Sequence, residues 1–253
     1  MALFKHEIPI LEYDSNPQAV LRHDRESVQF PQRAVFAFLG DAVDRYAAQM
    51  GAEILEVYET ISRNTNIYRL RHADQELCLC RAPLGGAAAV QLMDFLMGHG
   101  VKKIIAAGSC GALDALPENA FLLPEKALRD EGTSYHYLPP ARYVETSAAL
   151  RQVIASVLED RKRPFLPCTT WTTDGFYRET AEMIAYRRSE GCLTVEMECA
   201  SLAAAAKFRG AEFAQLLYTA DSLADADAYD PRDWGKASVE TALLICLDIA
   251  AQL

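Results

Sequence analysis

The stretch VKKIIAAGSCGAL, Val101 to Leu113, decides the fold class expected of this 253-residue chain. Its apolar run, ended by Gly108, is typical of a strand buried on both faces. A similar run, AVFAFLG, spans residues 34–40, and a helical pattern, GGAAAVQLMDFLMGHG, comes directly before Val101. Strands that alternate with helices predict an α/β fold, with a mostly parallel, twisted central sheet and helices on both faces.

The other segments continue this alternation. We expect further strands within 53–82 and at 120–128, 165–173 and 212–221, and helices at 41–50, 147–161, 180–191 and 238–253. Residues 192–210 are expected to form a strand that feeds into an Ala-rich helix, and the strand from Val101 is expected to end in a turn at residues 109–112. Residues 1–33 predict an extended N-terminal arm, and residues 34–253 a single catalytic domain.

Charge and composition exclude some classes of function. The formal net charge of −10 argues against a protein that coats nucleic acid or an anionic membrane. A small anionic substrate remains compatible with it, since local arginines or backbone amides can bind one. No apolar run is long enough for a membrane span, and the chain shows no secretory signal, so the seven cysteines predict a cytoplasmic protein with free thiols.

Sequence motifs narrow the chemistry further. Cys78 and Cys80 with His72 resemble the start of a metal site, but no second ligand pair follows at zinc-like spacing, so alternating positions on a strand are the better interpretation and no metal is expected. The motifs GxxxxGK[ST], HExxH and GxSxG, and a GxGxxG after the first strand, are absent. This disfavours an NTPase, a zinc protease, a serine hydrolase and a dinucleotide dehydrogenase.

The segment VEMECASL, Val195 to Leu202, places two carboxylates at the end of a strand. A buried Glu196 or Glu198 can accept hydrogen bonds from the vicinal hydroxyls of a ribose, and Met197 offers an apolar contact to the sugar. A surface glutamate pair near a helix N-terminus explains the motif equally well.

Asp221 ends the apolar strand EFAQLLYTAD. A carboxyl group there can protonate a leaving heterocycle if its surroundings raise its pKa. Taken alone, it fits a helix N-cap better.

Three other segments offer groups for an anion or a base. Backbone amides around Ser109 can hold an oxyanion, although an ordinary turn explains them as well. Arg45, in LGDAVDR, is a possible anion contact. Phe176 and Tyr177, in WTTDGFYRE, can pack on a flat base or belong to the core.

Taken in order, VKKIIAAGSCGAL, TDGFY, VEMECASL and the strand ending at Asp221 resemble the nucleoside phosphorylase superfamily, which includes purine nucleoside phosphorylase, uridine phosphorylase and methylthioadenosine nucleosidase. The similarity runs from about Val35 to the C-terminus. It implies a homo-oligomer, a dimer or a hexamer, whose active sites are shared between subunits, with inorganic phosphate as co-substrate and no organic cofactor.

The resemblance also implies a role for each site residue. Ribose would be bound by Glu196, Met197 and Glu198, the base by Phe176, Tyr177 and Arg178, and phosphate by Gly40, Arg45, Arg63 and Ser109. Asp221 would be the catalytic acid. Arg63 resembles the arginine that a neighbouring subunit contributes, and His6 is a weaker candidate for a residue supplied by a partner.

Three departures from the family pattern bear on the reaction. Ala106 stands where the phosphorylases carry an arginine, and the first phosphate loop reads Gly-Asp-Ala-Val-Asp-Arg, which puts Asp44 at the arginine position unless one residue is inserted. Arg81 is a possible substitute. The Gln-x-Arg uracil motif is missing after Tyr177, although DEGTSYHY, residues 130–137, resembles the uridine branch.

The sequence therefore predicts a nucleoside phosphorylase that cleaves the N-glycosidic bond with phosphate, with purine slightly favoured over uridine. The alternative is a nucleosidase that cleaves the same bond with water. Ala106 and Asp44 are compatible with this alternative. A binding protein that has lost catalysis is disfavoured because Glu198 and Asp221 are both present.

Overall fold

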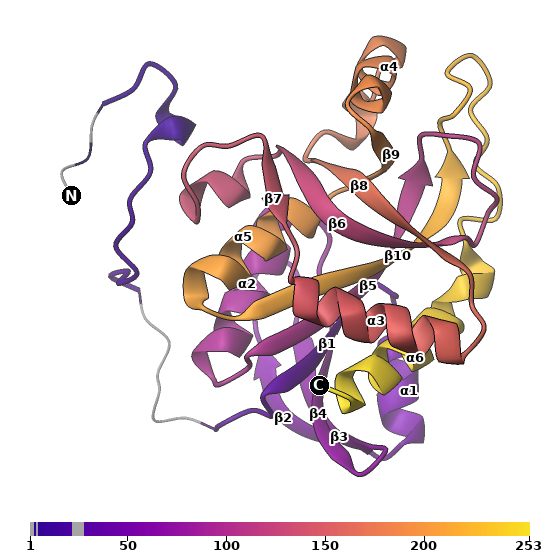
Figure 1. The fold of residues 1–253 in the computed structure, drawn as a ribbon. Coiled ribbons are helices and arrows are strands. Elements are labelled where there is room, and N and C mark those ends of the chain that lie inside the picture. Colours follow the sequence, from indigo (N-terminus) through magenta and orange to yellow (C-terminus); the bar gives the residue numbers. More distant parts are fainter. Residues whose placement is uncertain (1–2, 4, 22–27) are drawn as a thin grey trace.

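The computed structural model describes residues 3, 5–21 and 28–253. Residues 5–21 run along the outside of the body, next to the helix that ends at Arg209 (Figure 1). The guanidinium of Arg209 donates a hydrogen bond to the carbonyl oxygen of Pro17 at 2.8 Å. Residues 9–11 form a 3₁₀ turn, and the rest of this described segment has no helix or strand, as expected for an arm.

Ten strands and six α-helices follow in the described part of the chain. The strands are β1 (Arg33–Ala37), β2 (Glu53–Tyr58), β3 (Thr65–His72), β4 (Gln75–Arg81), β5 (Lys103–Ala112), β6 (Phe121–Asp130), β7 (Tyr143–Glu145), β8 (Phe165–Thr173), β9 (Cys192–Glu196) and β10 (Glu212–Ser222). The helices are α1 (Ala42–Gln49), α2 (Gly86–Gly98), α3 (Ala148–Asp160), α4 (Ala181–Ser189), α5 (Cys199–Arg209) and α6 (Val239–Ala251).

The prediction of a mostly parallel sheet is confirmed only in part, because the sheet is mixed. Its strands lie in the order β10-β6-β8-β9-β5-β1-β4-β3-β2, and β7 pairs with β6. β1, β4, β5 and β10 run parallel, whereas β2, β3 and β4 form antiparallel hairpins. The links between these last three strands are too short for a crossover helix, which forces them to be antiparallel.

One end of the sheet closes into a barrel. β5 pairs with β10 along most of its length, and its last residues, Gly111 and Ala112, pair antiparallel with β9. β10 in turn pairs with β6, which continues through β8 to β9 and completes the ring. The period of the apolar residues does not report strand direction, and the pairings of β10 with β5 and β6 join segments about 100 residues apart, so the sequence pattern did not predict them.

The turn expected at residues 109–112 is also absent, because β5 continues through it. Ser109 and Cys110 pair with Tyr218 and Thr219 of β10. The glycine in this stretch permits a close approach: a Cβ atom on Gly111 would lie 2.7 Å from the Leu223 side chain and 3.3 Å from the Asp221 carboxylate. The small residues therefore bring three strands together at the place where β10 ends.

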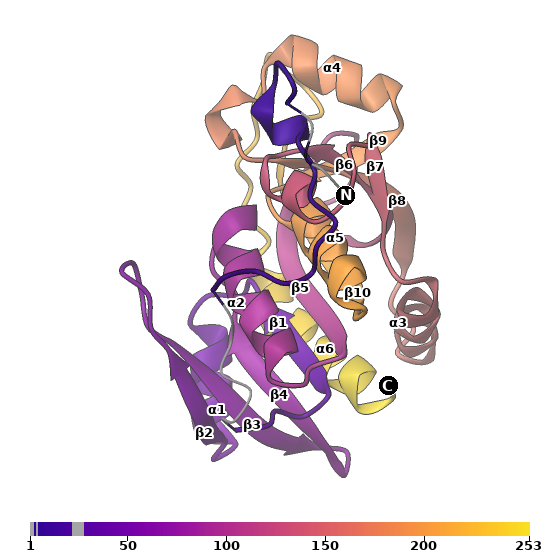
Figure 2. The same ribbon diagram turned by 90° about the vertical axis from the view of Figure 1, so that its left-hand side faces the viewer.

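Helices cover both faces of the sheet, as predicted. α1, α3 and α6 pack on one face, with side chains such as Val43, Ile154 and Leu247 in the core. α2 and α5 pack on the other face (Figure 2), with Met93 and Leu202 fully buried. All seven cysteines are buried and unbridged, which confirms that they serve as small apolar groups. Among the described residues no helix is long and apolar enough to cross a membrane.

Candidate active site

A pocket of about 170 Å³ lies where β5, β9 and β10 end. Six residues predicted for the site line it together: Ser109, Phe176, Glu196, Met197, Glu198 and Asp221. They come from segments up to about 110 residues apart in the chain. The barrel closure brings them to one place, because it turns the carboxyl ends of these strands toward each other.

Glu196 and Glu198 lie at the junction of β9 and α5. The Glu196 carboxylate accepts hydrogen bonds from the Thr172 hydroxyl at 2.5 Å and from the backbone amides of Glu198 and Cys199 at 2.8 and 2.7 Å. It therefore caps the N-terminus of α5 and fixes the loop. Glu198 accepts a hydrogen bond from the Gly85 amide at 2.5 Å. Both carboxyls are buried, which excludes the surface pair as an interpretation.

Burial raises the pKa of both glutamates, since the charged form loses its hydration. The charge of Glu196 raises the pKa of Glu198 further. Glu196 is held by three donors, so Glu198 is the carboxyl with capacity left for a sugar hydroxyl.

Asp221, at the end of β10, also lines the pocket. Burial raises its pKa, while the hydrogen bond from the Tyr229 hydroxyl, at 3.1 Å, lowers it. Asp221 continues β10 and caps no helix, which excludes the N-cap interpretation. A carboxyl with a raised pKa at the end of a pocket is suited to donate a proton.

A second carboxyl, Glu179, lines the pocket near Asp221. Burial and the charge of Asp221 raise the pKa of Glu179 to about 7. Within the described part of the chain, its carboxylate accepts no hydrogen bond, so it is available to a bound molecule. Glu179 and Asp221 together give this end of the pocket an acidic character.

The aromatic residues are divided between the pocket and the surface. Phe176 lines the pocket, and so does Trp234 from the loop before α6. Tyr177 is 92% exposed and does not line the pocket, because the 3₁₀ turn at residues 176–178 directs successive side chains outward. Arg178 in the same turn is also exposed and outside the lining.

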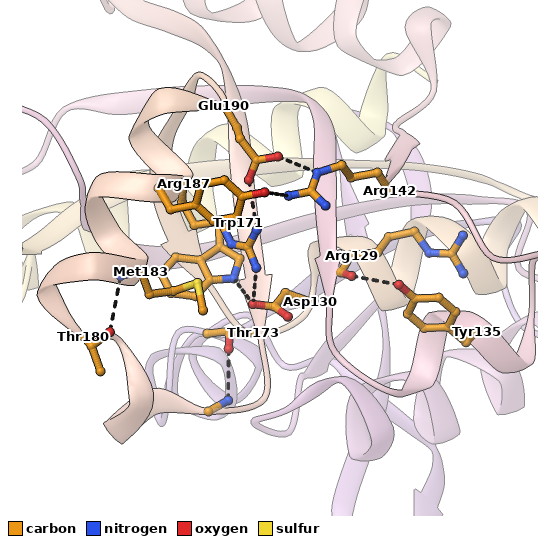
Figure 3. A network of polar contacts seen from close by, with 12 residues as sticks. Arg129, Asp130, Tyr135, Arg142, Trp171, Thr173, Thr180, Met183, Arg187 and Glu190 are labelled. Carbon is orange, nitrogen blue, oxygen red and sulfur yellow. Dashed lines mark hydrogen bonds and ion pairs between the residues drawn. The ribbon is translucent and has the colours of Figure 1, made fainter. Parts of the chain in front are cut away.

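A buried arginine anchors α4, the helix that follows this turn (Figure 3). Arg187 donates to Asp130 at 2.8 Å and to Glu190 at 2.9 Å, and its guanidinium lies 5.5 Å from the Trp171 ring. The Trp171 indole also donates to Asp130, at 2.9 Å. This network joins α4 to β6 and β8 and thereby fixes the segment that carries Phe176 and Glu179.

The predicted phosphate residues do not converge on the pocket. Gly40, in a left-handed conformation with φ +57°, begins the loop before α1, and Arg45 is exposed on α1. Arg63 is also exposed, 3.4 Å from Asp44. None of the three lines the pocket, and only Ser109 of this predicted set does.

Arginines and aspartates neutralise each other around the first loop. Arg81 forms an ion pair with Asp41 and lies 3.8 Å from Asp44, which also accepts a hydrogen bond from the Tyr68 hydroxyl at 3.0 Å. Asp44 therefore occupies the space between Arg63 and Arg81. His6, the other residue expected from a partner, is in the N-terminal arm, where its ring accepts a hydrogen bond from the Ile8 amide at 2.9 Å.

The lining residues that had no predicted role include three with polar or aromatic side chains, Glu179, Trp234 and Gln215. Gln215 had a signal, since it is the one polar residue in the apolar run from Phe213 to Tyr218. Glu179 was within a quoted motif but was not assigned a role. Nothing in the local pattern around Trp234 marks it.

The comparisons with known proteins identify the family of the chain. The model of the phosphorylase superfamily matches residues 32–250, so the chain belongs to this superfamily, as the sequence motifs predicted. A guanosine phosphorylase from Halorubrum lacusprofundi is 26% identical over 216 residues, which cover 80% of this chain and 88% of the relative.

Solved structures share the fold. A uridine phosphorylase from Vibrio fischeri superposes with a TM-score of 0.78 at 22% identity, covering 93% of this chain and all of the other. An AMP nucleosidase from Bacteroides thetaiotaomicron gives a TM-score of 0.71 at 23% identity, covering 88% and 89%. At these identities the structural similarity establishes the fold alone, an α/β fold with a mixed sheet. The similar structures include one protein named as a phosphorylase and one named as a nucleosidase.

Proposed function

We propose that this chain is a nucleoside phosphorylase that cleaves the N-glycosidic bond of a ribonucleoside with inorganic phosphate. One observation carries the proposal: a single pocket joins a carboxyl suited to ribose, Glu198, a carboxyl suited to proton donation, Asp221, and the Ser109 segment. The curated relative named as a guanosine phosphorylase supports the same reaction class. No metal or organic cofactor is needed for this chemistry.

The reaction places opposite charges at the two ends of the pocket. As the bond between C1′ and the base nitrogen breaks, the sugar becomes positive and the base takes the electron pair. Glu198 binds the ribose hydroxyls, Asp221 gives its proton to the departing base, and a phosphate oxygen forms the new bond to C1′. The products are the free base and ribose 1-phosphate.

The base is proposed to be a purine rather than uracil. Asp221 supplies a proton donor of the kind that a purine leaving group uses, and the Gln-x-Arg motif of the uridine branch is absent after Tyr177. The resemblance further implies a homo-oligomer with shared sites, in which Arg63 acts on the neighbouring subunit and Phe176 contacts the base.

Hydrolysis is the second candidate, and the first loop favours it. Asp44 lies between Arg63 and Arg81, so these guanidinium groups are already paired with an internal anion. Ala106 adds no cation. In a nucleosidase the Asp44 side chain would act as the base that activates a water molecule.

Base release from a panel of purine and pyrimidine nucleosides, with and without inorganic phosphate, distinguishes the two reactions. Release that requires phosphate and yields ribose 1-phosphate supports the phosphorylase and ranks the bases. Equal release without phosphate supports the nucleosidase, in which case Asp44→Asn should abolish activity. If no nucleoside is cleaved in either condition, both proposals fail.

A further inference from the structure

The side chain of Gln215 is a buried polar group without a partner in the pocket wall. Gln215 is 1% exposed and lines the pocket. Its Oε1 has no hydrogen-bond partner among the residues that the structure describes. Buried side-chain amides in native proteins are almost always hydrogen-bonded, so an unpartnered one in a pocket indicates that a ligand completes it.

The position of Gln215 shows which part of a substrate it can reach. On β10, residues on either side of it, Ala214 and Leu216, belong to the core beneath α6, so Gln215 points to the opposite face, where Ala106 lies directly across on β5. Ala106 has no side chain beyond Cβ, which leaves room for the longer amide. Asp221 lies six positions further along the same strand, and Glu198 follows β9 at the start of α5. Gln215 is therefore separated from Asp221, the proposed proton donor, by the length of strand between them.

The neighbouring groups at this end favour an anion. Two positions along, Leu217 pairs with Gly108, next to Ser109, and both Gly108 and Ser109 line the pocket. Rotation of the amide about its last bond exchanges the oxygen and the NH₂ group, so the same side chain can donate two hydrogen bonds. A serine hydroxyl and an amide NH₂ that line one pocket are donors that suit the oxygens of a phosphate.

We propose that Gln215 binds the attacking phosphate through its side-chain amide. This inference rests on the proposed phosphorolysis. A neutral amide in place of a cation binds phosphate more weakly, but it is retained in a buried position without the cost of burying a charge. Gln215 and Ser109 then orient the phosphate so that one of its oxygens faces C1′.

Two variants of similar volume test the role. Gln215→Met removes the donors and keeps the shape, so the KM for phosphate should rise about tenfold, equivalent to about 1.4 kcal/mol, while the KM for the nucleoside stays unchanged. Gln215→Glu places a carboxylate beside the phosphate and should raise the phosphate KM further than Gln215→Met does. Phosphate should also raise the Tm of the unsubstituted protein more than that of Gln215→Met, a readout of binding that needs no turnover.

Thr170→Val is the matched control. Thr170 is fully buried on β8, its hydroxyl is unpartnered among the described residues, and it does not line the pocket. Its replacement should leave the phosphate KM unchanged. If folded Gln215→Met keeps the phosphate KM of the parent, or raises only the nucleoside KM, the role of Gln215 is refuted while phosphorolysis stands. Phosphate-independent cleavage by the unsubstituted protein would refute both.

Discussion

Asp221 shows how a single residue acquires its chemistry from its neighbours. Its carboxyl is buried and accepts a hydrogen bond from Tyr229, and the absence of a side chain on Gly111 leaves room for it. Burial raises its pKa and the Tyr229 hydroxyl partly opposes the effect. Such a carboxyl keeps its proton to a higher pH than an exposed aspartate does.

Replacement of this carboxyl should remove the proton donor. We expect Asp221→Asn to lower kcat/KM for a purine nucleoside by a factor of about 10² to 10⁴, because an amide of the same shape does not transfer a proton to the base. Steady-state kinetics with the purified variant measures the loss. Asp160→Asn, an exposed change at the end of α3, is the control and should have no effect. Turnover near the parent level in Asp221→Asn would exclude Asp221 as the acid.

Glu179 makes the stability of the protein depend on pH. Its pKa rises from 4.5 in the unfolded chain to about 7 in the folded protein, so the proton is held more tightly after folding. The stability from this group is complete below pH 4.5 and is lost as the pH rises through 7.

Glu179→Gln should therefore raise the Tm at pH 8 and leave it unchanged near pH 4.5. Since Glu179 is only partly buried, solvent screening reduces the gain in the free energy of unfolding to about 1 kcal/mol. This gain corresponds to a rise in Tm of about 2–4 °C for a chain of this size. Calorimetry at the two pH values measures the difference. An equal shift at both values would show that the substitution acts through packing rather than through charge.

At the scale of elements, α4 is held by one buried arginine rather than by an apolar face. Ile184 is the only apolar residue of α4 that is fully buried in the structure described, whereas Arg187 joins two carboxylates and the Trp171 ring. The helix begins at Thr180, whose hydroxyl accepts a hydrogen bond from the Met183 amide. The position of Glu179 thus depends on a polar network 8 residues away.

Arg187→Met should destabilise the protein by about 2–3 kcal/mol, because it leaves Asp130 and Glu190 without the buried cation that joins them. We also expect the KM for the nucleoside to rise severalfold, since the base side of the pocket loses its support. Arg188→Ala, on the same helix and paired with Asp114 at the surface, is the control and should cost less than about 1 kcal/mol. Equal effects of the two substitutions would refute the anchoring role.

The sequence predicted the positions of the helices and strands better than it predicted which strands pair with each other. β1, β5 and β10 were recognisable because each is an apolar run buried on both faces, and α2, α3 and α6 were recognisable by their period. The extension of β5 through Ser109 was missed, since small residues at a close strand approach look like a turn. The barrel closure depends on pairings between distant segments, which no local pattern reports.

Site residues at the ends of strands were predicted from the sequence, whereas site residues in loops were missed. Glu198, Asp221 and Ser109 each come after or within an apolar run, and the fold brings them to one pocket. Trp234 reaches the pocket from the long loop between β10 and α6, in a turn that follows Pro231. The roles assigned to Arg45 and Tyr177 stay predictions, because neither side chain lines the pocket of a single chain.

At the scale of the whole molecule, the loop between β2 and β3 projects from the body at the left edge of Figure 2. It carries Arg63 and Ile61, which is fully exposed, and β2 beside it exposes Ile54 and Val57. An exposed apolar edge strand next to a charged loop is typical of a contact between subunits. We propose that Arg63 serves the pocket of a neighbouring subunit, as the resemblance implies.

Mixed oligomers test whether the site is shared. Arg63→Ala and Asp221→Asn should each be inactive alone. If Arg63 acts on the neighbouring subunit, a dimer of one Arg63→Ala and one Asp221→Asn chain has one of its two sites with both groups intact, so the isolated mixed dimer should have about half of the parent activity. The chains are co-expressed with two different tags, and the mixed species is isolated on both. Activity that stays at the level of the single variants, in a verified mixed dimer, would mean that Arg63 serves its own chain or none.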